Sequence, residues 1–249
     1  MTLYDGLDAA ALAGRLALPR VEVFDEIGST LDEAHRLAAQ GTPAGTMVLA
    51  DAQTAGRGRQ GRQWRSASGA GVWVTLVERP GDGSGLGVLS LRCGLYAAEA
   101  LDSLAGARVA VKWPNDLYAG DGKLAGILVE TRWRASAPDW VAIGFGLNVI
   151  APDLETAAGL APGASRLAAL DAVIPALRRA VAAHGELTAA ELGRWAERDI
   201  ASGRIVTSPA HGRAVGITAA GELLIESGDG RIAPHRSGSL LFAEPLACS

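Results

Sequence analysis

A glycine- and arginine-rich stretch, residues 53–65, is the part of this sequence whose composition points most directly to chemistry. Its sequence is Gln-Thr-Ala-Gly-Arg-Gly-Arg-Gln-Gly-Arg-Gln-Trp-Arg, and no acid occurs between Asp51 and Glu78. Glycines let the backbone approach a ligand closely and adopt positive φ. Arginine side chains and exposed backbone N–H groups bind phosphate or carboxylate oxygens, and Trp64 offers a flat face for a purine ring. The stretch is therefore typical of a loop that wraps an anionic nucleotide.

Taken alone, this stretch allows two other interpretations. Such a loop can simply be solvated, with its arginines keeping the chain soluble, and a Gly/Arg loop that ends in an aromatic residue also occurs in RNA-contacting segments. Motifs further along the chain favour the nucleotide. They are Lys112-Trp113-Pro114-Asn115-Asp116, Lys123-Leu124-Ala125-Gly126-Ile127-Leu128-Val129-Glu130 and Gly144-Phe145-Gly146-Leu147-Asn148-Val149.

Together with Ser29-Thr30, these motifs resemble those of the biotin–protein ligase family in their order and spacing. The resemblance covers residues 24–149 strongly and the rest of the chain loosely. It implies an ATP-dependent ligase that forms biotinyl-5′-AMP from biotin and MgATP and then transfers biotin to a lysine of a biotin carboxyl carrier domain. ATP and Mg²⁺ would be co-substrates, biotin the substrate, and no tightly bound prosthetic group is expected.

The resemblance also assigns roles to individual residues. Catalytic roles fall on Arg59, Lys123 and Lys112, and retention of the adenylate is expected to depend most on Arg59. The residues expected at biotin are Ser29, Thr30, Leu31, Gln53, Arg57, Gly58, Arg59, Lys123, Gly126, Gly144 and Gly146. Those expected at the nucleotide are Arg57, Arg59, Arg62, Trp64, Lys112, Asn115 and Asn148. Asp116 is the expected Mg²⁺ ligand, or it orients Lys112.

Activation of a carboxylate by ATP explains why cations would gather in such a site. The acid and the triphosphate repel one another, so positive groups must hold both. Guanidinium, ammonium or Mg²⁺ can then stabilise the charge that develops at phosphorus. This reaction needs no enzymic nucleophile, and the four histidines (His35, His184, His211 and His235) lie in no motif.

Two rival functions stay open. The nearer is a lipoate or octanoate ligase or transferase, which shares the fold and the transfer to a carrier lysine. The other is a nucleic-acid-binding module that uses the loop Arg57–Arg65 on RNA or single-stranded DNA, without ATP turnover and with a steep salt dependence.

The local sequence predicts the elements that would position these residues. Thr30 and Glu33 fit a capping box, and either Ser29 or Thr30 is expected to cap a helix whose apolar face contains Leu31, Ala34, Leu37 and Ala38. Proline cannot continue a strand, so Pro114 should display its polar neighbours at a strand end, and Asp121-Gly122 predicts a hairpin turn. Further helices are expected at 5–17, 88–104, 166–183 (with Pro175 as a possible break) and 188–199. Strands are expected at 21–24, 46–50, 71–77, 109–112, 117–118, 123–133 and 140–149.

This pattern predicts an α+β fold with a mixed, largely antiparallel sheet flanked by helices, of the class II synthetase or biotin ligase type. The chain changes character after residue 203, where short strand-like segments alternate with glycine-rich turns. We expect a catalytic domain at 1–203 and a small SH3-like β-barrel domain at 204–249. The expected strands of the latter are 205–206, 214–217, 223–225 and 240–242.

Composition bounds the function further. A net charge of −4 and a pI near 5.6 argue against a general nucleic-acid binder. Only 28 residues precede Ser29, too few for the winged-helix domain of the bifunctional relatives, so neither DNA binding nor a repressor role is expected. Cys93 and Cys248 favour neither a disulfide nor a metal site. With no signal peptide or apolar span in the sequence, a cytoplasmic protein without a membrane partner is expected. We expect it to be a monomer or a weak homodimer.

Overall fold

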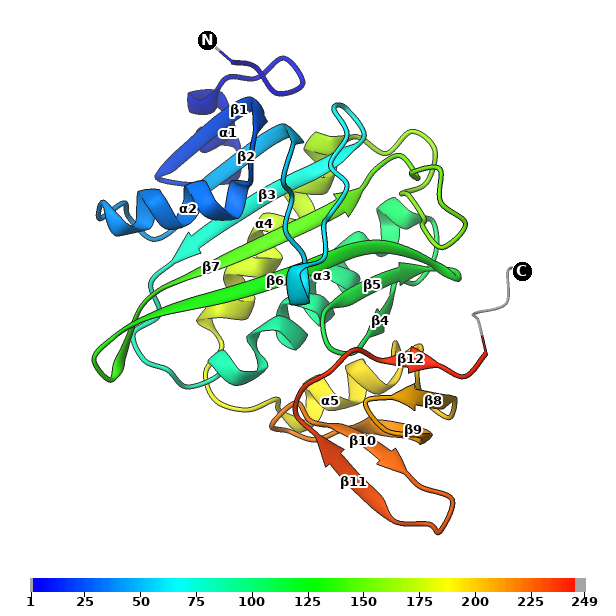
Figure 1. Ribbon diagram of the computed structural model, residues 1–249. Coiled ribbons are helices and arrows are strands. Elements are labelled where there is room, and N and C mark those ends of the chain that lie inside the picture. Colours follow the sequence, from blue (N-terminus) through cyan, green and yellow to red (C-terminus); the bar gives the residue numbers. More distant parts are fainter. Residues whose placement is uncertain (1, 245–249) are drawn as a thin grey trace.

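The computed structural model describes residues 2–244 and contains two β-sheets (Figure 1). The larger sheet has seven strands in the order β1-β2-β3-β7-β6-β5-β4. β1 and β2 are parallel, and every other neighbouring pair in this sheet is antiparallel. The predicted mixed, largely antiparallel sheet is therefore confirmed. Its strands are β1 (Arg20–Ile27), β2 (Thr46–Gln53), β3 (Gly71–Glu78), β4 (Ala110–Lys112), β5 (Asp116–Ala119), β6 (Gly122–Arg134) and β7 (Ala137–Asn148).

A second, smaller sheet lies at the C-terminal end of the described chain, in the order β11-β10-β9-β8-β12. Its strands are β8 (Ile205–Ser208), β9 (Gly212–Ile217), β10 (Leu223–Glu226), β11 (Ile232–His235) and β12 (Leu241–Phe242). β11 was not among the predicted strands, and it contains Pro234. The proline is tolerated because β11 is an edge strand paired only with β10. The division at residue 203 and the SH3-like barrel stay predictions, and Cys248 lies outside the described residues.

The alternation of side chains gives the large sheet two different faces. One face carries Met47, Leu49, Val74, Ile143 and Phe145 into the main core. Figure 1 shows α3 and α4 behind this face of the sheet. The helices that contribute to the main core are α1 (Ala9–Leu16), α3 (Leu89–Ala105), α4 (Arg166–Ala182) and α5 (Ala189–Ala196).

The opposite face is covered only in part, by α2 (Thr30–Ala39). Three apolar residues of α2 pack there against Val48, Val77 and Trp140; they are Ala34, Leu37 and Ala38. Farther along β6 and β7 this face carries glycines in place of large side chains, at 126, 144 and 146. One part of this face is therefore filled by a small second core, and the part with the glycines has space for a cavity.

The start of α2 has one of the two caps that the sequence allowed, without the capping box predicted for Thr30 and Glu33. Ser29, not Thr30, is the N-cap residue, and its Oγ accepts a hydrogen bond from the Leu31 N–H at 3.3 Å. Thr30 is the first residue of the helix, and its N–H and hydroxyl both donate to the Gln53 side-chain oxygen. A capping box does occur at α5, between Thr188 and Glu191.

Helix α4 continues through a proline, and a buried tryptophan connects the two sheets. α4 runs without interruption through Pro175, with Ile174 and Leu177 on either side of it fully buried, so the predicted break is absent. Trp113 is buried and donates its indole N–H to Gly221 O at 3.0 Å, which links the two sheets. Among residues 2–244, no helix is long and apolar enough to cross a membrane.

Candidate active site

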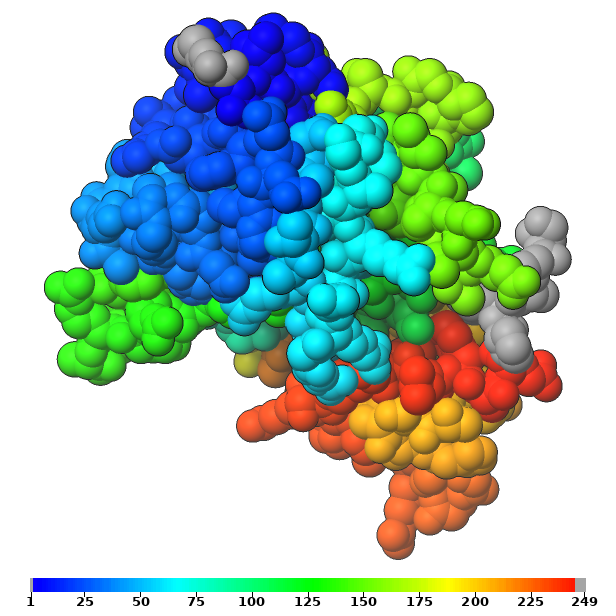
Figure 2. Space-filling model, turned by 45° about the horizontal axis from the view of Figure 1, so that its top comes forward, coloured from blue at the N-terminus to red at the C-terminus, as the bar shows by residue number. Residues whose placement is uncertain are grey.

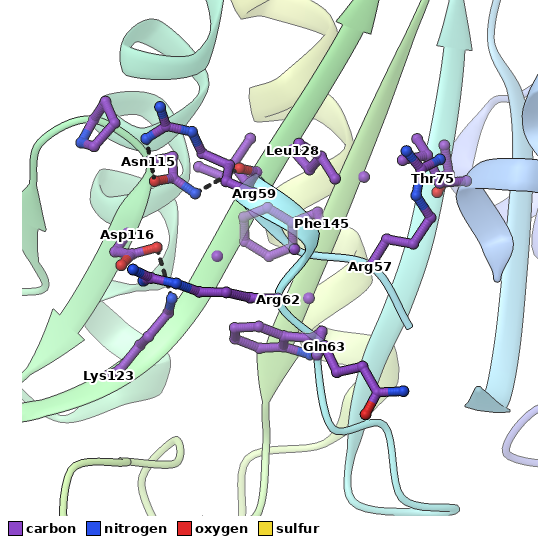
Figure 3. Close-up of a pocket in the computed structure, with 18 of the residues that line it drawn as sticks. Arg57, Arg59, Arg62, Gln63, Thr75, Asn115, Asp116, Lys123, Leu128 and Phe145 are labelled. Atoms are coloured by element: carbon purple, nitrogen blue, oxygen red, sulfur yellow. Dashed lines mark hydrogen bonds and ion pairs between the residues drawn. The ribbon is translucent and has the colours of Figure 1, made fainter. Parts of the chain in front are cut away.

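A cavity of about 180 Å³ lies on the face of the large sheet that α2 leaves open (Figure 3). The loop 54–65 covers it, and the turn between β4 and β5 and residues 239–241 close one side. With the exception of Asn148, every predicted site residue lines this cavity. They are Ser29, Thr30, Leu31, Gln53, Arg57, Gly58, Arg59, Arg62, Trp64, Lys112, Asn115, Asp116, Lys123, Gly126, Gly144 and Gly146.

Asn148, predicted at the nucleotide, has a supporting place instead. Its side chain is buried at the end of β7, and its amide group donates to Lys123 O at 3.2 Å and to Ala158 O at 3.1 Å. Both amide hydrogens are therefore used to tie β7 to the start of β6. The structure places Asn148 behind Lys123 and outside the cavity lining.

One end of the cavity is polar but uncharged. The Gln53 side-chain oxygen accepts from the Thr30 N–H at 2.8 Å and from the Thr30 hydroxyl at 3.1 Å. The Gln53 amide group donates to Ser66 Oγ at 2.7 Å, and the Thr30 and Thr75 hydroxyl oxygens are 2.9 Å apart. Because these partners fix one another, the end is a preformed set of neutral donors and acceptors.

Thr75 is a site residue that the sequence analysis missed. It is fully buried on β3, lines the cavity and completes the network around Thr30. The signal was present in the sequence, since Thr75 is the one polar side chain in the otherwise apolar segment 72–77. Its position on the strand puts it on the open face rather than in the main core.

The other end of the cavity is cationic. Lys123 Nζ lies 2.7 Å from Asp116 Oδ1, and Arg59, Arg62 and Lys112 line the same region (Figure 3). Burial lowers the pKa of Lys112 and of Arg59, while the Asp116 carboxylate acts in the opposite direction on both. Four cations thus surround one carboxylate among the described lining residues, and this excess positive charge suits a ligand with several negative oxygens.

The backbone around Lys123 holds it firmly. Its N–H donates to Thr156 O at 2.8 Å, and its carbonyl accepts from the Ala158 N–H at 2.9 Å. Gly122 is required next to it, because a Cβ there would lie 2.8 Å from the Ala158 nitrogen. The predicted hairpin turn between β5 and β6 therefore places the lysine at the edge of the cavity.

Asn115 anchors the turn that Pro114 begins. Its Nδ2 donates to Ile127 O and its own carbonyl accepts from the Ile127 N–H, both at 2.9 Å. Its Oδ1 accepts from Arg59 at 3.3 Å. As predicted, β4 ends before Pro114 and displays its polar neighbours; the Trp113–Pro114 peptide bond is cis. Asn115 thus connects β6 to the arginine loop.

The sequence of the loop suggested that its positive charge has no acidic partner. In the structure, one of its arginines does have acidic partners. Arg57 makes ion pairs with Asp32 Oδ1 at 2.8 Å and with Glu130 Oε1 at 2.6 Å. In Figure 3 its side chain lies on the opposite side of the pocket from Asp116 and Lys123. The acids come from α2 and β6, far from the loop in sequence, so the local charge pattern could not reveal them.

Trp64 lies directly on two of the predicted glycines. A Cβ on Gly146 would be 2.5 Å from Trp64 Nε1, and one on Gly126 would be 3.0 Å from the ring. Gly144 differs, since its nearest neighbour would be Leu128 O at 3.4 Å. In this structure the Trp64 indole therefore lies against the glycine backbone, where we expected the ring of a bound ligand. Lys123 Nζ lies 5.1 Å from the centroid of the Trp64 ring.

The C-terminal segment takes part in the site. Arg59 donates to Gly238 O at 3.4 Å, Arg62 donates to Ser239 Oγ at 3.3 Å, and Ser239 donates to Gln60 at 3.0 Å. Lys112 Nζ lies 4.9 Å from the centroid of the Phe242 ring. Figure 2 shows the loop, in cyan, reaching the red C-terminal segment. The sequence had suggested that the C-terminal segment caps the ATP site, but no signal in it identified these individual residues.

The described residues offer little for a resident metal ion. Residues 2–244 contain no group of three or more His, Cys, Asp or Glu side chains that could hold one. Asp116 is the one carboxylate among the described residues that line the cavity, and it is already paired with Lys123. Mg²⁺ fits here only as an ion that arrives with phosphate oxygens and keeps water ligands; the role of Asp116 toward it stays a prediction.

Comparison with known proteins places residues 24–148 in a family model described as the biotin/lipoate A/B protein ligase family. The bifunctional ligase/repressor BirA of Escherichia coli (strain K12) is 34% identical over 256 aligned positions, covering 94% of this chain and 77% of that protein. A biotin–[acetyl-CoA-carboxylase] ligase of Paracoccus denitrificans is 43% identical over 143 residues, 55% of this chain and 57% of that protein. The chain spans only 39% of the length of the Bacillus relatives that it matches.

The fold is also found in solved structures. The biotin protein ligase from Aquifex aeolicus in complex with biotin and ATP superposes with a TM-score of 0.76. It is 26% identical, and the match covers 91% of this chain and 100% of that one.

Proposed function

Because the chain belongs to the biotin/lipoate A/B protein ligase family, we propose that it is an ATP-dependent biotin–protein ligase. The observation that carries this proposal is the division of the cavity into a neutral polar end at Thr30 and Gln53 and a cationic end at Lys112 and Lys123. Biotin has the same division, with a neutral cyclic urea at one end and a carboxylate at the other. The cationic end also suits the phosphates of ATP.

In the first step, a biotin carboxylate oxygen attacks the α-phosphorus of ATP. A mixed anhydride, biotinyl-5′-AMP, forms and pyrophosphate leaves. Lys123 would hold the carboxylate and the α-phosphate, while Arg59, Arg62 and Lys112 would balance the charge that develops on the phosphate oxygens. Asp116 would orient Lys123, because the two side chains already form an ion pair.

In the second step, the neutral ε-amine of a lysine on a biotin carboxyl carrier domain attacks the carbonyl carbon of the anhydride. An amide forms, AMP leaves, and the amine loses a proton. The covering loop, with Trp64 over the floor of the cavity, would keep water from the anhydride in the meantime. The cavity is smaller than the roughly 300–1,000 Å³ common for small-molecule sites, so the loop would have to move outward to admit the substrates.

The nearest rival, lipoate or octanoate as the substrate, belongs to the same family. A dithiolane or an alkyl chain has no N–H or C=O group, so it could not use the donors and acceptors at Thr30, Gln53 and Thr75. The neutral end of the cavity therefore favours biotin. The second rival, a nucleic-acid-binding module, gains no support from a loop whose Arg57 is already paired with two carboxylates.

Transfer to a carboxylase carrier domain is supported by the relative from Paracoccus denitrificans, a biotin–[acetyl-CoA-carboxylase] ligase. The absence of a repressor role and of DNA binding, a cytoplasmic location and a monomeric or weakly dimeric state are all predictions. Mobility-shift assays with DNA, cell fractionation and size-exclusion chromatography with light scattering would test them.

The decisive experiment is biotin-dependent exchange of labelled pyrophosphate into ATP, with lipoate and octanoate in parallel. Exchange with biotin alone is expected. Exchange only with lipoate or octanoate would keep the fold and overturn the substrate. No exchange with any of the three acids in the presence of Mg²⁺ would overturn the proposed reaction.

A further inference from the structure

We propose that Asp32 and Glu130 form a carboxylate clamp that holds the arginine loop over the cavity by gripping Arg57. In this role both acids are positioning residues, and Arg57 anchors the loop rather than binding phosphate. If the proposed function holds, the clamp determines how long an acyl-adenylate stays on the protein. The clamp itself can be tested without any substrate.

The contacts of Arg57 come from both sides of its guanidinium group. Asp32 Oδ1 on α2 lies 2.8 Å from one terminal nitrogen, and Glu130 Oε1 on β6 lies 2.6 Å from the other. The Arg57 side chain is 39% exposed and that of Glu130 is 32% exposed. With two negative charges for one positive charge, this guanidinium group has little attraction left for phosphate.

Glu130 is itself held in place. The Trp140 indole N–H donates to His35 Nδ1 at 2.9 Å, so the proton of the neutral imidazole must be on Nε2. That nitrogen lies 2.9 Å from Glu130 Oε2 and donates to it. Glu130 Oε2 thus accepts from His35, while Oε1 makes the short contact with Arg57; Oε2 also lies 3.5 Å from Arg57. Trp140 is buried in the small core under α2, which gives the chain of contacts a rigid base.

The loop depends on such side-chain anchors. Among the described residues, the backbone hydrogen bonds of 56–64 run within the loop, from Gly58 N to Arg62 O, from Arg62 N to Arg59 O and from Trp64 N to Gly56 O. Its tip is held by the C-terminal segment, through Arg59 and Arg62. On the side toward α2 and β6, Arg57 provides the anchor. Release of Arg57 would therefore loosen the pairing that also places Trp64.

The test compares Glu130→Gln and Asp32→Asn with Glu33→Gln. Glu33 is a matched control, because it too is an acid paired with an arginine. Its partner is Arg36 on the same helix, at 2.5 Å, and not a residue of the loop. Amide hydrogen exchange of residues 56–64 in the ligand-free protein, with tryptic cleavage after Arg59 and Arg62, reports directly on the loop. Each clamp variant is expected to speed exchange and cleavage roughly threefold or more, in line with a partly exposed ion pair, and the control to leave both unchanged.

A double-mutant cycle makes the assignment specific. In an Arg57→Ala background, Glu130→Gln should have no further effect on loop exchange, because the group it grips is gone. The inference is overturned if Glu130→Gln leaves loop exchange unchanged, if Glu33→Gln has the same effect, or if the two substitutions act additively. Thermal unfolding of each variant separates loop release from a general loss of stability.

The consequence for the reaction is measured separately. The ratio of free biotinyl-5′-AMP released to pyrophosphate formed should rise with Glu130→Gln, while the rate of adenylate formation changes less. An unchanged ratio would overturn the link between the clamp and retention. If the wild-type protein forms no adenylate at all, the proposed function fails, whereas loop exchange still decides whether the clamp exists.

Discussion

The two ends of the cavity are built in different ways. The neutral end, around Thr30, Gln53 and Thr75, consists of groups on α2, β2 and β3 that hydrogen-bond to one another and are largely buried. The cationic end joins three separate parts of the chain: the arginine loop, the strands around Lys112 and Lys123, and the C-terminal segment. The neutral end is thus preformed by its own hydrogen bonds, whereas the cationic end depends on three chain segments coming together.

This difference corresponds to two tasks. Recognition of a neutral polar ring requires fixed partners whose geometry excludes the wrong substrate, and a hydrogen-bonded network on rigid elements supplies them. Phosphoryl chemistry requires concentrated charge that can close on a nucleotide and open again, and a covering loop that moves as proposed would supply this. Substitutions at the two ends should therefore differ in the kinetic constant they change.

The largest effect is expected from Lys123→Ala, at the cationic end. The substitution removes a cation at the reacting centre and leaves the Asp116 carboxylate without its partner at 2.7 Å. The rate of biotin-dependent pyrophosphate exchange should fall roughly 100- to 1,000-fold, as for other preorganised stabilising groups. Arg65→Ala is the control, because Arg65 is exposed and lies outside the cavity lining. A loss of less than threefold with Lys123→Ala would remove this lysine from the reaction.

The pair Gly146→Ala and Gly144→Ala tests the floor between the two ends. A methyl group at 146 would meet Trp64 at 2.5 Å and displace it, whereas one at 144 would make ordinary contact. Overpacking of this kind should raise the KM for biotin roughly tenfold for Gly146→Ala, with a shift in tryptophan fluorescence. Gly144→Ala should change either quantity little. Equal effects of the two substitutions would show that the indole does not occupy this floor in solution.

At the neutral end, Thr75→Val keeps the shape but removes the hydroxyl that pairs with Thr30 at 2.9 Å. Loss of one buried hydrogen bond should raise the KM for biotin roughly five- to tenfold and leave the KM for ATP unchanged. Thr42→Val is the matched control, because it breaks a similar buried threonine pair, with Thr46 at 2.7 Å, away from the cavity. If Thr75→Val raised the KM for ATP instead, the division of the cavity would be wrong.

The last prediction concerns stability and not catalysis: behind the cationic end, Asp199 forms a β-bridge with Val111. Burial raises the pKa of Asp199 to about 6, above its ordinary value. Between that ordinary value and pH 6 the folded protein therefore binds more protons than the unfolded chain, and the free energy of unfolding falls as pH rises. The substitution Asp199→Asn tests this. It keeps an acceptor for the Ala201 N–H and removes the buried charge.

The variant should raise the free energy of unfolding by about 1–3 kcal/mol at pH 7.5 and change it little at pH 4. Thermal unfolding at both pH values would measure this. A destabilised variant at pH 7.5 would contradict the burial of a charged Asp199.

Much of this molecule was determined by the sequence on its own. The periodicity of apolar residues predicted the elements of the large sheet and its helices, because a buried strand or an amphipathic helix needs that pattern wherever it lies. The motifs around Lys112, Lys123 and Gly146 marked the residues that line the cavity. Even the missed Thr75 left a signal, as a lone polar residue in an apolar strand.

Only the tertiary structure decided which of these residues face one another. Arg57 is paired with acids 25 and 73 positions away, Trp64 fills the space over Gly126 and Gly146, and Gly238 and Ser239 reach the loop across 177–179 positions. Asn148 belongs to a motif yet lies outside the cavity lining. A local pattern records the burial and the conformation of its own segment, but charge compensation and close contact depend on partners that folding brings from elsewhere in the chain.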